Sequence, residues 1–237
     1  MKLNASNVSF KDLNYSIKAS RDKEIIVDNV LGQRYIGSGV IGKKIIINGT
    51  PGNALGAYLM DSTIIVNGSG QDATGDTMDS GSIIVYGNCG DTTGYAMRGG
   101  EIYIKGNAGY RVGIHMKEYA DKIPVIVVGG KVGDFLGEYQ AGGIIVVLGI
   151  GVEGIPVGAF CGTGMHGGKI YIRSSQIPVG LPKQVVAEKL ENKKEVEPYV
   201  KKYVKYFGGN AQEILKDDFI KLYPNSKNPY KQLYTKN

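Results

Sequence analysis

The sequence predicts an all-β fold: a single-stranded, right-handed parallel β-helix of about seven to eight coils with a short α-helical C-terminal tail. Three observations lead to this class. Six-residue blocks with apolar columns recur at a nearly constant spacing, a glycine motif follows four of them, and the pattern changes after Pro182. Glycine supplies 36 of the 237 residues, about twice its usual share. Because these glycines separate runs of Ile and Val, we expect a folded chain with many tight bends.

The repeated blocks are the predicted strands, and the last residues of seven of them are spaced 19, 19, 19, 24, 19 and 25 residues apart. Within each block the second and fourth residues are apolar, and residues two apart share one face of a strand. These two columns should therefore face a common interior, with successive coils paired in parallel about 4.8 Å apart. The blocks are Lys44–Gly49, Thr63–Gly68, Ser82–Gly87, Glu101–Gly106, Val125–Gly130, Ile144–Gly149 and Lys169–Ser174, with Glu24–Asn29 as a leading eighth.

The third residue of each block should point outward, yet it too is apolar throughout. An apolar stripe of this length has to be covered. Either this chain's own C-terminal helices or another protein could cover it, which makes the stripe a candidate docking surface. Its residues are Ile46, Ile65, Ile84, Tyr103, Val127, Val146 and Tyr171.

The motif G-x-x-G-x-x-x-G follows four of the strands. A bend repeated at the same place in each coil needs a positive φ or a missing Cβ, and glycine supplies both. We therefore assign these glycines a structural role, and we expect Leu59, Met78, Met97, Met116 and Met165, which precede the next strands, to fill the core. The motif glycines are Gly49, Gly52, Gly56, Gly87, Gly90, Gly94, Gly106, Gly109, Gly113, Gly130, Gly133 and Gly137.

Three segments follow from these patterns: an N-terminal cap over residues 1–23, the Gly-rich coils over 24–175 and a helical tail over 176–237. Helical spacing in the tail predicts helices at 185–190, 196–207 and 211–215, and Pro224 and Pro229 punctuate the end. Both terminal segments should cover exposed ends of the stack.

Charge and hydropathy exclude two classes of partner. Residues 1–175 hold 16 Lys and Arg against 15 Asp and Glu, so the net charge of +6 lies mainly in the tail, and no basic stripe with aromatic platforms suggests nucleic-acid binding. The apolar stretch 142–160 contains Glu153 and several glycines, which favours strand and turn over a membrane span. The absence of a signal-peptide pattern and of a disulfide framework places the chain in a reducing cytoplasm.

Few residues could carry chemistry. Cys161 and His166 could in principle form a nucleophile and base, with Cys89 and His115 remaining. A zinc site needs three or four ligands, and no others assemble by register. Four aspartates on two adjacent coils could bind a cation, although turn carboxylates are the favoured interpretation; they are Asp72, Asp76, Asp79 and Asp91.

Two segments match the dinucleotide fingerprint G-x-G-x-x-G, at residues 37–42 and 149–154. The fingerprint is meaningful only where it follows a strand and opens a helix, and neither match precedes a helical pattern. The sequence thus predicts no catalytic, cofactor-binding or metal-binding residue in this chain.

A resemblance to the C-terminal domain of the glutamate synthase large subunit is carried by the repeated glycine motif, the segments 94–104 and 137–149, and the tail residues 203–207 and 214–216. The stretches that start at Gly32 and at Gly164 resemble the stand-alone form of that domain. The resemblance covers about residues 24–220. It implies a scaffolding subunit without catalytic residues, in a complex that moves the amide nitrogen of glutamine onto 2-oxoglutarate. The partners would be amidotransferase and FMN synthase subunits, which would hold the FMN and the iron–sulfur clusters.

The same coils also resemble the C subunit of formylmethanofuran dehydrogenase, another component of a larger oxidoreductase. An independent ligand-binding protein or enzyme using Cys161 and His166 is a third hypothesis. The sequence leaves open which partner complex is present and whether the chain associates with itself.

Overall fold

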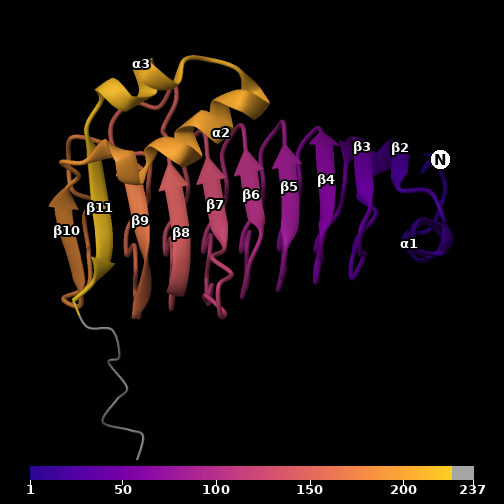
Figure 1. Ribbon diagram of the computed structural model, residues 1–237, viewed down its shortest axis with the longest axis horizontal. Coiled ribbons are helices and arrows are strands. Elements are labelled where there is room, and N and C mark those ends of the chain that lie inside the picture. Colours follow the sequence, from indigo (N-terminus) through magenta and orange to yellow (C-terminus); the bar gives the residue numbers. More distant parts are fainter. Residues whose placement is uncertain (226–237) are drawn as a thin grey trace, which may run out of the picture.

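The computed structural model describes residues 1–225 and consists of one eleven-stranded, mostly parallel sheet with a few helices (Figure 1). The strands lie in the order β1-β2-β3-β4-β5-β6-β7-β8-β9-β11-β10. The predicted end of the tail, including Pro229, lies outside the described residues. The strands are β1 (Lys2–Asn4), β2 (Glu24–Leu31), β3 (Lys44–Thr50), β4 (Ser62–Asn67), β5 (Gly81–Val85), β6 (Glu101–Ile104), β7 (Val125–Val128), β8 (Ala141–Val147), β9 (Gly167–Arg173), β10 (Val185–Lys189) and β11 (Phe219–Pro224). The helices are α1 (Phe10–Ala19), the 3₁₀ helix η1 (Lys193–Glu195), α2 (Glu197–Phe207) and α3 (Ala211–Lys216).

The predicted fold class, a β-helix, is wrong, because the chain forms a single open sheet. A β-helix would need further strands on the return path of each coil. Here the return path is a series of turns, in which alternate residues such as Ala54, Gly56 and Tyr58 have φ between 55° and 63°. Left-handed backbone at alternate positions is incompatible with a β-strand. The glycine motif therefore marks a whole wall of turns, where the sequence had suggested a single bend.

The pairing of the repeated blocks is confirmed. Ile45 lies opposite Ile25 on one side and Ile64 on the other, and the same parallel register continues to β9. The second and fourth block residues, including Ile45 and Ile47, are fully buried. The predicted fillers, from Leu59 to Met165, are buried in the same core between the sheet and the turns.

The turns are joined from coil to coil by main-chain hydrogen bonds, which explains where their polar groups go. The amide of Gly56 donates to the carbonyl oxygen of Ile36 in the preceding turn, and that of Ala54 donates to Asp72 in the next turn. Gly56 has φ +63°, and a Cβ there would lie 2.7 Å from Cδ1 of Ile83 in the core. Gly52 has no positive φ; a Cβ on it would overlap the carbonyl oxygen of Gly32. The motif glycines thus serve two needs, left-handed backbone and close approach of neighbouring turns.

The terminal segments close the two ends of the sheet. At the N-terminus, β1 pairs with β2, and Leu13 and Ile17 of α1 join the core. In the tail, α2 and α3 confirm two of the three predicted helices, whereas the helix predicted at 185–190 is wrong: residues 185–189 form the strand β10. β10 pairs antiparallel with β11, which pairs antiparallel with β9. The apolar residues of 185–190 fitted a helical spacing, but pairing with the last parallel strand decides their conformation.

Candidate functional site

The outer face of the sheet is the most distinctive surface of the chain, because an apolar row crosses it from strand to strand. The row follows the strand register, so that its side chains lie next to one another on neighbouring strands. Ile26 on β2 belongs to it, which the sequence stripe missed although the leading block Glu24–Asn29 contained the signal. The row is Ile26, Ile46, Ile65, Ile84, Tyr103, Val127, Val146 and Tyr171.

The C-terminal half of this row is covered by the chain itself. Tyr103, Val127, Val146 and Tyr171 are all at most 1% exposed and pack with Val196 and the buried residues of α2 in a second hydrophobic cluster. Figure 1 shows α2 lying in front of the C-terminal strands. The helix follows the period of an amphipathic segment, since its buried residues are Val200 and Tyr203.

Specific contacts fix α2 on the sheet. The hydroxyl of Tyr203 donates a hydrogen bond to the carbonyl oxygen of Lys105, 3.0 Å away. The ring of Tyr206 packs edge-on against the ring of Tyr103. The ring of Phe207 packs edge-on against that of Tyr86, which follows β5 directly. Lys202 forms an ion pair with Glu101 of β6. The helix is therefore held by both apolar and polar contacts, up to the end of β5.

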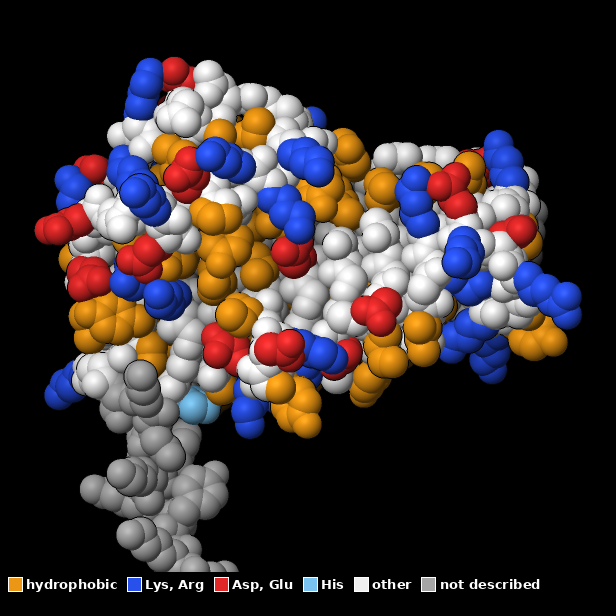
Figure 2. All heavy atoms as spheres, viewed as in Figure 1, with side chains coloured by type: hydrophobic (Ala, Val, Ile, Leu, Met, Phe, Trp, Pro, Cys, Tyr) orange, Lys and Arg blue, Asp and Glu red, His pale blue; other side chains and the backbone are white. Residues whose placement is uncertain are grey.

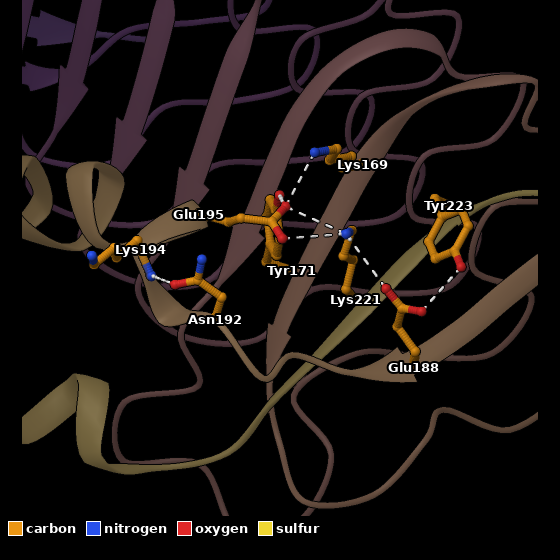
Figure 3. A network of polar contacts seen from close by, with 8 residues as sticks. All are labelled: Lys169, Tyr171, Glu188, Asn192, Lys194, Glu195, Lys221 and Tyr223. Atoms are coloured by element: carbon orange, nitrogen blue, oxygen red, sulfur yellow. Dashed lines mark hydrogen bonds and ion pairs between the residues drawn. The ribbon is translucent and has the colours of Figure 1, made fainter.

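A polar network holds the segment before α2 against β9 and β11 (Figure 3). The carboxylate of Glu195 accepts a hydrogen bond of 2.8 Å from the hydroxyl of Tyr171 and lies 3.1 Å from Nζ of Lys169. Lys221 lies 3.3 Å from the same carboxylate and 3.4 Å from that of Glu188. The Tyr171 hydrogen bond first, and then the lysines, lower the pKa of Glu195. The network joins the tail to the sheet and has the character of a structural clamp.

The N-terminal half of the row is open except at Ile84, which is 3% exposed. Ile26, Ile46 and Ile65 are only half-buried, and none of the described helices crosses β2, β3 or β4 on this face (Figure 1). Figure 2 shows that charged side chains are sparse in the middle of the face beside α2. The apolar row thus continues beyond the part that α2 covers. An uncovered continuation of this kind is unusual on a monomeric protein.

The margins of this open half are polar, but their charges are paired within the chain. Along one margin Lys44 lies 2.8 Å from Glu24. Along the other margin, Nζ of Lys2 lies 2.9 Å from the carboxylate of Asp28. The same carboxylate accepts a hydrogen bond of 2.6 Å from Nδ2 of Asn48. Hydrogen bonds to Asn48 and Lys2 lower the pKa of Asp28, and those from Lys44 lower the pKa of Glu24. The open half therefore presents an apolar strip between neutralised borders.

Two of the residues that could have carried chemistry, Cys89 and Cys161, lie in the interior as free thiols. Cys89 is 7% exposed and Cys161 is fully buried. Burial raises the pKa of both thiols to about 12, so neither forms a thiolate at neutral pH. Nδ1 of His166 lies 3.1 Å from the carbonyl oxygen of Gly164. In this arrangement Cys161 is a core residue.

The four aspartates of the neighbouring turns bind main-chain amides, a lysine or a hydroxyl group of the chain itself. Oδ1 of Asp72 accepts from the amide of Asp91, and Oδ1 of Asp91 accepts from the amide of Tyr110, both at 2.9 Å. Asp79 pairs with Lys122 at 2.6 Å, and Asp76 accepts from the hydroxyl of Thr77. Within residues 1–225, no three His, Cys, Asp or Glu side chains are grouped as a metal site would require.

The second G-x-G-x-x-G match borders a polar cavity at the end of the sheet, next to Arg173 and Asp217. These two residues form an ion pair with each other. Residues 149–154 are followed by irregular chain, so the helix that the dinucleotide fingerprint requires is missing here. Among the described helices none has the length and apolarity needed to cross a bilayer.

The fold and this face define a class of Gly-rich repeat proteins in which one long sheet is backed by stacked turns. The chain belongs to the GXGXG motif family, whose model matches residues 6–226. It is 41% identical over 249 residues to an uncharacterized protein of Methanocaldococcus jannaschii, covering 98% of this chain and 95% of that protein. Membership in this family confirms the resemblance to the glutamate synthase-type domain.

A chain in the crystal structure of the formyltransferase/hydrolase complex of Methylorubrum extorquens, solved with methylofuran, has a similar fold. The TM-score is 0.60 and the sequence identity 21%, and the match covers 90% of this chain and 86% of that one. That complex contains several subunits, and the similarity extends over nearly the whole of this chain.

Proposed function

We propose that this chain is a non-catalytic assembly subunit of a multi-subunit enzyme, of the type represented by the formyltransferase/hydrolase complex. The half-covered apolar row is the observation that carries the proposal. An apolar face that remains open beside α2 is the kind of surface that a partner subunit covers. The two buried thiols, with pKa values near 12, give no support to catalysis by this chain alone.

The glutamate synthase-type complex is the second candidate, and the tail favours it. The segments 203–207 and 214–216, on which that resemblance rests, fold as parts of α2 and α3. The fold similarity to the formyltransferase/hydrolase chain, extending over most of both chains, supports the first candidate. Both hypotheses place the reaction on partner subunits, so the identity of the partners separates them.

Affinity purification of the tagged chain from its native cell tests the proposal. We expect stoichiometric partner subunits in wild-type preparations and their loss with Ile46→Asp, because docking would bury an unpaired carboxylate. The matched control is Ile41→Asp, since Ile41 is 60% exposed and lies outside the row. Formyltransferase- or hydrolase-type partners support the first candidate, and amidotransferase and FMN synthase subunits support the second.

Turnover by the purified chain alone would overturn the assembly role. The variants Cys161→Ala and His166→Ala would then show whether these side chains carry it. Unchanged partner recovery with Ile46→Asp would remove the open half of the row from the docking surface.

A further inference from the structure

Helix α2 shows what this sheet face accepts. Its N-cap Val196 and its inward residues Val200 and Tyr203 recur every three or four positions and pack on the row. A helix that crosses the strands advances about 5.4 Å per turn, whereas neighbouring strands lie about 4.8 Å apart. Each helical turn thus lies over roughly one strand. The row therefore fits a helix whose apolar residues recur once per turn.

The row continues past the point where α2 ends. Ile84 lies opposite Tyr103 in the register, Ile65 opposite Ile84, and Ile46 opposite Ile65. After Phe207, Gly208 and Gly209 have φ of +82° and +101°, and the chain turns back into α3, which packs against α2. The rest of the described tail pairs with β9 at the opposite end of the sheet. The described chain therefore leaves room for about three more helical turns on the same row.

The polar residues along the margins indicate which side chains a docking partner should present on either side of its apolar stripe. Glu24 and Lys44 already neutralise each other, as do Asp28 and Lys2. Nδ2 of Asn67 donates to Oδ1 of Asn48 at 2.7 Å, which extends a neutral amide border along one side. The charged side chains among these residues are already paired with one another. A molecule that docks on the row would therefore gain little from charged side chains along its edges, whereas uncharged polar side chains would fit.

We infer that the open half receives an amphipathic helix of a partner subunit, laid end to end with α2 over Ile26, Ile46 and Ile65. This inference rests on the proposed assembly role and specifies its contact. The helix presents apolar residues three or four positions apart and uncharged polar flanks. The partner helix would continue the layer that α2 forms over the sheet, because two helices that pack on the same face have the same diameter of about 10 Å.

Two other occupants fit less well. A second copy's sheet would have to pack on the face next to α2, which already lies on the C-terminal part of the same row. An added β-strand needs a free sheet edge, and the row lies on a face, away from the edge strands β1 and β10.

Site-directed cross-linking tests the inference. A maleimide–benzophenone reagent is attached to Ile46→Cys and to Ile65→Cys, the tagged chains are introduced into cells, and the cross-linked peptides of the isolated complex are sequenced. The buried Cys89 and Cys161 do not compete for the maleimide. We expect both positions to reach one partner segment at sites three or four residues apart, and Ile41→Cys to give no link to that segment.

Salt dependence supplies an independent measurement. We expect the dissociation constant of the complex to change less than about threefold between 0.1 and 1 M NaCl, where the screening length falls from about 10 to 3 Å. Ile46→Asp should weaken binding at least about tenfold.

Several results would overturn the helix. These are cross-links spaced two residues apart, links to a second copy of this chain, or links to residues 226–237. A complex that forms while Ile46→Cys remains fully reactive would defeat this inference and leave the assembly role standing. The absence of any partner in the purification would defeat the proposed function itself.

Discussion

Tyr203 of α2 fits against the sheet only because residue 129 is glycine: a Cβ on Gly129 would overlap both the hydroxyl oxygen of Tyr203 and the carbonyl oxygen of Lys105. Gly129 follows directly after β7, below the helix. The hydroxyl that passes over it donates to Lys105 at 3.0 Å. A missing side chain on one strand thus makes the docking of a helix from the tail possible.

Gly129→Ala should destabilise the chain by about 2 kcal/mol, since the added methyl group forces α2 off the sheet. Urea unfolding followed by circular dichroism measures the change. Gly70→Ala is the control, because a Cβ there would meet only two side-chain atoms at 3.1 and 3.3 Å, and we expect less than about 1 kcal/mol. Equal costs for the two variants would contradict the described fit.

Tyr203→Phe should cost about 1 kcal/mol, the net value of one buried hydrogen bond. Tyr15→Phe should leave the unfolding free energy unchanged, because Tyr15 is 75% exposed. Combined with Gly129→Ala, the cost of Tyr203→Phe should shrink, because the displaced helix has already lost this bond. Strict additivity of the two substitutions would show that the residues act separately.

The sequence predicted the parts of this fold that depend on periodicity. The blocks from Glu24 to Ser174 gave strand positions, parallel register and core faces, because every coil repeats the same alternation. It did not predict the single open sheet. Left-handed conformations at Ala54, Tyr58 and equivalent residues are imposed by turn-to-turn hydrogen bonds between coils, which no residue type in the sequence announces.

The candidate site divides in the same way. Alternation revealed the outward apolar row, including Ile46 and Ile65, but not where α2 would end on it. That end depends on Gly208 and Gly209 and on the packing of α3, which are matters of tertiary contact. The strand β10 at 185–189 was missed for a related reason, because its pairing partner β11 lies more than thirty residues further along the chain.

Glu195→Gln should make stability less sensitive to acid. The lowered pKa of Glu195 means that its contribution to stability is full above the unfolded value, about 4.3, and is lost as the pH falls through the folded value. Unfolding free energies measured from pH 7 to pH 3 should fall less steeply in the variant than in the wild type. Glu213→Gln, in an exposed pair with Lys216, should follow the wild type. Parallel curves for Glu195→Gln and the wild type would contradict the clamp.

The two native thiols should resist alkylation in the folded chain. Their pKa of about 12, against an ordinary value of 9, reduces the thiolate population by about a thousandfold at pH 8. The raised pKa also implies stability that is fully present below about pH 9 and is lost as the pH rises toward 12. Iodoacetamide labelling with mass analysis should give no adduct at pH 8 until urea is added. Ile46→Cys supplies one reactive thiol as a positive control, and rapid labelling of Cys89 or Cys161 without urea would mean that the core opens.

Two adjacent isoleucines separate the inner from the outer face of the sheet. Ile64 is fully buried in the core between sheet and turns, whereas Ile65 lies on the open half of the outer row. Ile64→Ala should therefore cost about 2 to 5 kcal/mol through lost transfer energy and a cavity. Ile65→Ala should cost less than about 1 kcal/mol in the isolated chain, because its side chain is only half-buried there. Urea unfolding of both variants measures this, and a larger cost at position 65 would mean that the two faces of β4 are assigned the wrong way round. In the assembled complex the difference should narrow, since a partner that covers the row gives Ile65 the burial that it lacks alone.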